Sequence, residues 1–141
     1  MAKNIQYNDN TEAVLGKLNA AIRMGNIAIG LSAERHAKKK ITSEGAVDTG
    51  RLRNSITYAL AGEPANVKSY TADDGEETYT YEGVAEGAKG SGVYIGTNVE
   101  YAEGIETGSR RKAGAVHFLQ DAATGHKEEY KKLMEDAMKN A

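Results

Sequence analysis

The chain has 141 residues, the length of one domain, and no cysteine, which excludes disulfide bonds, a thiolate nucleophile and cysteine-based zinc sites. Its 18 basic and 20 acidic residues give a formal net charge of −2, which argues against a general nucleic-acid binder. No apolar run reaches membrane-spanning length, and residues 1–10 form a polar N-terminal arm without the apolar stretch of a signal peptide. We therefore expect a small, soluble, cytosolic single domain over residues 1–141.

Few large apolar side chains are available for a core. The chain has 16 glycines and 8 tyrosines, but one phenylalanine and no tryptophan. This composition predicts a thin core and raises the question of what else stabilises the fold. One answer is that part of the buried surface exists only between subunits.

Charge is unevenly placed along the chain. Residues 1–62 carry a net charge of +4, residues 63–106 of −8, and residues 107–141 of +2. Two interpretations stay open: solvated faces of one molecule, or complementary surfaces that attract copies of the same protein.

Residues 11 to about 43 are predicted to form one long helix. Thr11 can cap it, and Gly45 can end it. Apolar residues recur at three- and four-residue steps and form one stripe: Val14, Leu15, Leu18, Ile22, Gly25 and Ile29. Glycines inside a helix each cost roughly 1 kcal/mol relative to alanine, so Gly16, Gly25 and Gly30 indicate a kink or close packing by another backbone.

A junction follows at residues 44–54, where a short turn carries Arg51, Leu52 and Arg53. Residues 56–60 then alternate between large and small side chains, which predicts a strand with one buried face. The region 62–92 is acidic and glycine-rich, and we expect a hairpin or loop there. It contains possible strands at 67–71 and 78–81, joined by a turn at 73–75.

Residues 93–97 predict the next strand, and residues 99–102 continue it or begin a turn. A glycine-rich, basic loop is expected over 104–115, and a single amphipathic helix from about 116 to the end. The expected fold class is α+β: a long N-terminal helix, an antiparallel sheet of three to five strands, and a C-terminal helix on the same face of that sheet.

No catalytic constellation emerges from the sequence. Residues 48–50 spell the Asp-Thr-Gly triplet of aspartic proteases, but Arg51 follows, and a cation beside Asp48 disfavours the shared proton that such a dyad needs. His36 and His126 have no partner at zinc-binding spacing, apart from Glu129 three residues after His126, which is a weak metal signal. We therefore predict no enzyme activity, no cofactor and no metal site.

Three segments, in this order after a long helix, resemble the gene-product-ten-like family of tailed-phage neck and tail-completion proteins. They are residues 47–56 (VDTGRLRNSI), residues 95–102 (IGTNVEYA) followed by 105–108 (IETG), and residues 117–119 (HFL) followed by 122–123 (AA). The resemblance covers about residues 11–141. Ala46 stands where the family usually has proline, and region 62–92 is longer than the family core.

The resemblance implies a structural subunit of the phage head–tail connection, assembled in the host cytoplasm and located in the virion. Its partners would be further copies in a ring, for which six-fold symmetry would match the tail, and the neighbouring head-closure and tail-terminator or tube proteins. The residues that carry the family pattern are implied to define the fold: Asp48, Thr49, Gly50, Arg51, Leu52, Ser55, Gly96, Tyr101, Ala102, Glu106, Gly108, Phe118 and Leu119.

Two alternatives stay open. Genome DNA passes through a phage neck, so basic side chains are candidate subunit or DNA contacts: Arg35, Lys38, Lys39, Lys40, Arg51, Arg53, Arg110, Arg111 and Lys112. The other alternative is an aspartic-type protease that uses Asp48.

Overall fold

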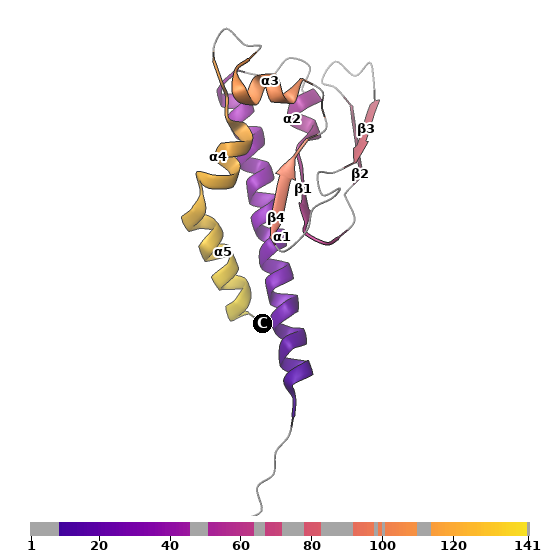
Figure 1. The fold of residues 1–141 in the computed structure, drawn as a ribbon, viewed down its shortest axis with the longest axis vertical. Coiled ribbons are helices and arrows are strands. Elements are labelled where there is room, and N and C mark those ends of the chain that lie inside the picture. The colour runs from indigo at the N-terminus through magenta and orange to yellow at the C-terminus, as the bar shows by residue number, and fades with distance from the viewer. Residues whose placement is uncertain are drawn as a thin grey trace, which may run out of the picture.

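The computed structural model describes residues 9–45, 51–63, 67–71, 78–82, 92–97, 99, 101–109 and 114–140. The elements in chain order are α1 (Thr11–Ser43), α2 (Arg51–Ser55), β1 (Thr57–Leu60), β2 (Val67–Thr71), β3 (Thr78–Glu82), β4 (Val93–Gly96), α3 (Ala102–Thr107), α4 (Phe118–Thr124) and α5 (Lys127–Lys139). Helix α1 runs through the whole molecule, with α4 and α5 along one side and β1 and β4 along the other (Figure 1).

The predicted long helix is confirmed as α1. Its first residue is Thr11, whose backbone N–H donates a 3.0 Å hydrogen bond to Asp9 Oδ1. The Thr11 side chain, followed by this backbone N–H, lowers the pKa of Asp9 through hydrogen bonding. The N-cap position is occupied by Asn10 rather than by Thr11. At the other end, Gly45 adopts a left-handed φ of 66°, which turns the chain away from the helix as expected.

The expected single sheet of three to five strands is wrong. The four described strands form two separate antiparallel pairs, β1 with β4 and β2 with β3. In the first pair Thr57 lies opposite Gly96 and Leu60 opposite Val93. The chain turns at Gly62, where φ is 78°, before β2 begins, so β2 leaves the first ladder and pairs with the next strand. The turn predicted at 73–75 and residues 83–91 of the region 62–92 lie outside the described residues.

The core lies against the C-terminal half of α1. Small α1 residues face it, and Phe118 is its largest fully buried side chain. The buried cluster comprises Ala33, Ala37, Ile41, Leu52, Ile56, Val99, Ala102, Val116, Phe118 and Ala122. Because alanines project little from the helix, α2, β1 and α4 can approach the α1 backbone closely.

The single C-terminal helix expected from residue 116 is two helices. Helix α4 ends at Gly125, whose N–H donates to Asp121 O at 2.7 Å, and α5 begins after His126. The bend lets α5 follow α1, while α4 contacts both α1 and β4. The long helix α1, rather than the sheet, is therefore the main packing partner of α5.

The loop expected over 104–115 begins with a helix, α3, which the sequence analysis did not predict. Gly104 is buried inside it, and the helix ends at Gly108, where φ is 79°. A Cβ atom at Gly108 would lie 2.5 Å from Ala115 N, so this position requires glycine both for its φ and for the close backbone.

The three glycines of α1 differ in what they contact. A Cβ atom at Gly30 would overlap the ring of Tyr58 on β1, and one at Gly25 would lie 2.5 Å from Met134 Sδ on α5. Gly16 has open space around it. Two of the three glycines thus serve close packing, but against side chains rather than against another backbone.

We expect Gly30→Ala to destabilise the fold by about 1–3 kcal/mol, because the added methyl group overpacks against a ring held in a strand. Gly16→Ala is the matched control, and it should stabilise by about 1 kcal/mol because helix propensity alone changes there. Urea unfolding followed by circular dichroism measures both. Equal effects at the two positions would contradict the packing role of Gly30.

Candidate functional site

Two of the segments that carry the family resemblance are joined by a short relay of hydrogen bonds. Ser55 Oγ donates to Leu52 O at 2.7 Å, and Ser55 Oγ lies 2.5 Å from Thr97 Oγ1. Since the Ser55 hydroxyl proton is already used, Thr97 donates to Ser55, and Thr97 in turn accepts from Val99 N–H at 3.1 Å. The relay fixes the end of α2 to the end of β4 within a buried environment.

Glu106 binds the N-terminus of α4. Its Oε2 accepts from Leu119 N–H at 2.9 Å and its Oε1 from Gln120 N–H at 3.0 Å. The backbone adds two hydrogen bonds from the preceding segment, Val116 N to Ile105 O and His117 N to Glu106 O. A carboxylate at the N-terminus of a helix accepts hydrogen bonds from backbone N–H groups that have no partner within the helix. Its negative charge also interacts favourably with the positive end of the helix dipole. Glu106, which was expected in the loop over 104–115, caps α4 in the structure.

Most of the remaining motif residues that the structure describes are buried or packed against the core. Leu52, Gly96, Ala102 and Phe118 are buried, and Tyr101 and Leu119 pack against the core cluster. Asp48, Thr49 and Gly50 lie outside the described residues, as does the protease alternative that rests on Asp48. Arg51 opens α2.

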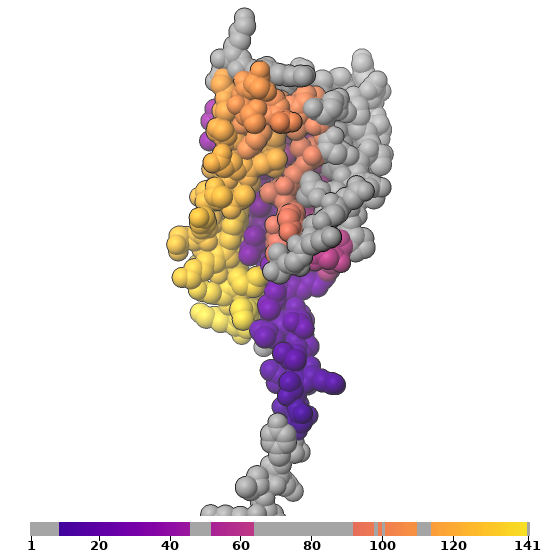
Figure 2. All heavy atoms as spheres, in the orientation of Figure 1, coloured from indigo at the N-terminus to yellow at the C-terminus, as the bar shows by residue number. Residues whose placement is uncertain are grey.

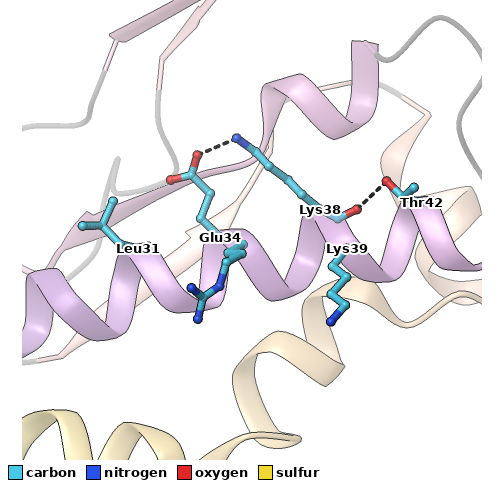
Figure 3. Close-up of a pocket in the computed structure, with 6 residues that line it drawn as sticks. Leu31, Glu34, Lys38, Lys39 and Thr42 are labelled. Carbon is cyan, nitrogen blue, oxygen red and sulfur yellow. Dashed lines mark hydrogen bonds and ion pairs between the residues drawn. The ribbon is translucent and has the colours of Figure 1, made fainter.

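The basic cluster at the end of α1 is partly neutralised by acidic residues. Lys38 Nζ lies 2.7 Å from Glu34 Oε1, as Figure 3 shows, and Lys40 Nζ lies 3.6 Å from Glu44 Oε1. Lys39 is exposed. Paired lysines present less positive charge to a phosphate backbone, which weakens the DNA-contact alternative at this end of the helix. Arg53 is half-buried, and Arg110, Arg111 and Lys112 lie outside the described residues.

The first turns of α1 carry an uncovered apolar stripe. They stand clear of the rest of the molecule in the space-filling view (Figure 2). Val14 is 54% exposed and Leu15 49%, and Leu18 and Ile22 are also exposed. The same side of the helix is buried at Ala21 and at Gly25, where a Cβ atom would meet Met134 of α5. The stripe therefore adjoins the packed contact between α1 and α5, but the described residues leave its four large aliphatic side chains exposed.

Next to this stripe, a groove of about 600 Å³ separates α1 from the last turns of α5. Small and apolar side chains line most of it, with Met24 and Leu133 on opposite walls. Met24 is 59% exposed. The groove extends the uncovered apolar surface around α1.

A polar cluster lies where the first turn of α5 meets α1. His36 Nε2 is 2.6 Å from Glu129 Oε2, and the rings of His36 and His126 stack with centroids 3.5 Å apart. The other oxygen of Glu129 accepts from Ser32 Oγ at 2.7 Å and from Arg35 Nη2 at 3.4 Å. The side chains of His36, His126 and Glu129 are all partly buried.

The surroundings of this cluster shift the pKa values of two side chains, Glu129 and Tyr130. The hydrogen bond from Ser32, followed by that from His36, lowers the pKa of Glu129. Burial, followed by the charges of Glu129 and Asp121, raises the pKa of Tyr130 to about 12. The Tyr130 hydroxyl donates to Ala122 O across the α4–α5 bend, so its protonated form is the one that the fold uses.

From the sequence, only part of this cluster was visible: Glu129, three residues after His126, was judged a weak metal signal. The third member, His36, lies on α1, far away along the chain. What the sequence could not supply was the register of α5 against α1.

Comparison with known proteins returned no match among protein-family models, curated proteins or solved structures. Among the described residues, no helix combines the length and the apolar character needed to cross a membrane.

We expect Glu106→Ala to destabilise the fold by about 1–2 kcal/mol, because two N–H groups of α4 lose their acceptor. Glu103→Ala, an exposed acid on the same short helix, is the matched control and should change stability by less than about 0.5 kcal/mol. Thermal and urea unfolding measure both. A loss at Glu103 equal to that at Glu106 would contradict the capping role.

Proposed function

We propose that the chain is a structural subunit of the head–tail connection of a tailed phage, and that it acts by assembling into a ring with copies of itself. The resemblance of the three segments supplies the biological setting. The observation that carries the assembly part is the uncovered apolar stripe of Val14, Leu15, Leu18 and Ile22 on the projecting end of α1.

Burial of this stripe would supply the driving force. Each large aliphatic side chain that moves from water into an interface contributes about 1.5–3 kcal/mol. Exposed apolar surface of this kind, contiguous along one helix, is typical of protein interaction sites. The thin core of each subunit fits this arrangement, because part of the apolar surface would be buried only in the assembled ring.

The partner in this proposal is a second copy of the chain. The uneven charge supports that choice, because residues 1–62 carry +4 and residues 63–106 carry −8. A ring requires two different patches that meet head to tail. A basic N-terminal block and an acidic middle supply complementary patches on one chain.

The β2–β3 pair offers a second contact. A two-stranded ribbon alone is marginally stable in water, and within the described residues β2 and β3 pair only with each other. Addition of this ribbon to the sheet of a neighbouring subunit would satisfy its edges through backbone hydrogen bonds. Burial of the α1 stripe would then supply the affinity between neighbouring subunits, and strand pairing would fix how they are aligned.

We expect the purified chain to form a closed ring of identical subunits in native mass spectrometry, six in number if the ring follows tail symmetry. Leu15→Glu and Leu18→Glu should each shift the population to monomer, because a charge would enter the buried interface. Gly16→Glu is the control, since it adds the same charge about 100° or more around the helix from both leucines.

Circular dichroism of each variant separates loss of assembly from loss of folding. Reconstruction of phage particles should then place the chain at the neck. A wild-type chain that stays monomeric at all concentrations and is absent from virions would overturn the proposal, as would equal assembly of all three glutamate variants.

A further inference from the structure

We propose that His36, His126 and Glu129 bind one divalent transition-metal ion, of which zinc is the model case, at the contact between α1 and α5. Imidazole nitrogens and a carboxylate oxygen are the ligands that zinc takes in proteins that lack cysteine at the site. This inference goes beyond the proposed function and does not depend on it.

The three side chains converge on one point. One ligand atom from each lies within 4.8 Å of the other two. Two of these distances are 2.6 Å, from His36 Nε2 to Glu129 Oε2, and 4.0 Å, from His126 Nδ1 to Glu129 Oε2. Ligand atoms about 2.0–2.1 Å from a tetrahedral metal are about 3.3 Å apart. The two observed distances differ from this value by less than about 1 Å. The rings of His36 and His126 are stacked nearly parallel, with centroids 3.5 Å apart and an interplanar angle of 8°. Because an imidazole nitrogen coordinates in the plane of its ring, metal binding requires at least one ring to rotate out of the stack.

The surrounding groups determine which atom of His126 and which atom of Glu129 remain free to bind a metal. Asp121 Oδ2 lies 3.2 Å from His126 Nε2, which leaves Nδ1 directed to Glu129. Ser32 and Arg35 bind Oε1 of Glu129, which leaves Oε2 for the metal. Metal-binding histidines commonly donate their second N–H to a carboxylate, and ligating carboxylates are commonly hydrogen-bonded by neighbours.

The local charge and exposure suit a cation. Asp121 and Glu129 contribute two negative charges against one positive charge from Arg35, whose side chain is 70% exposed and lies on the outer oxygen. The His36 side chain is 18% exposed, so the site is shielded but open to entry from solvent. Three protein ligands leave a fourth position for water.

The consequence of binding would be a cross-link between α1 and α5. An ion that binds the folded chain and not the unfolded chain raises the free energy of unfolding, and with it the unfolding temperature, as the logarithm of the free ion concentration relative to Kd. At this position it would fix the first turn of α5 on the C-terminal half of α1.

The test uses the full-length chain without an affinity tag. Titration calorimetry with Zn²⁺ should show one ion bound per chain, and Zn²⁺ should raise the unfolding temperature whereas Mg²⁺ should not. His36→Gln and His126→Gln should each weaken Zn²⁺ binding at least 10-fold. His117→Gln is the matched control, because His117 is exposed and lies outside the cluster, and it should bind as the wild type does.

A measurement on the wild-type chain keeps the proposal falsifiable if a variant fails to fold. Substoichiometric Co²⁺ should shift or broaden the NMR ring signals of His36 and His126 and leave those of His117 unchanged. Absence of 1:1 binding, unchanged affinity in both histidine variants, or broadening centred on His117 would each overturn the metal site.

Discussion

The fold depends on how closely other elements approach α1. The helix presents small residues to neighbours on two sides: Gly25 leaves room for Met134 of α5, and Gly30 for the ring of Tyr58 on β1. Ala33 and Ala37 belong to the core around Phe118. Small residues let neighbouring elements sit near the helix backbone, where dispersion contacts are dense. A sheet strand, α4 and α5 therefore all take their positions from the same helix, and the relay through Ser55 and the cap by Glu106 secure the segments between them.

Local signals predicted the elements well where periodicity was strong. The 33-residue α1 and the strands at 57–60, 67–71, 78–82 and 93–96 follow from helical spacing and alternation. The short turn predicted at Arg51 is the helix α2 in the structure. The pairing of the strands could not be predicted from these local signals. It depends on the turn at Gly62 and on which strands can pack beside α1. Helix α3 was missed because Gly104 and Gly108 suggested a loop, although one is buried in the helix and only the other ends it. The break between α4 and α5 sits at Gly125 inside a continuous helical pattern, where periodicity carries no stop signal.

The candidate functional site was also predictable only where a local sequence pattern marked it. The apolar stripe of α1 was visible in the sequence, but only the structure separates its covered part at Ala21 and Gly25 from its uncovered part at Val14 and Leu15. Lys38 and Lys40 were predicted as candidate subunit or DNA contacts, and in the structure a glutamate one turn away pairs with each of them. The histidine cluster required the register of two helices that are distant in sequence, and no local pattern encodes that register.

The contact between Ser32 and Glu129 spans 97 positions of the chain. During synthesis α1 emerges before the residues of α5 that cover it at Gly25. Contacts of such long separation carry a loop-closure cost and slow folding. Until α5 has emerged, the side of α1 that α5 covers stays open, and productive folding competes with premature association of α1 between neighbouring nascent chains.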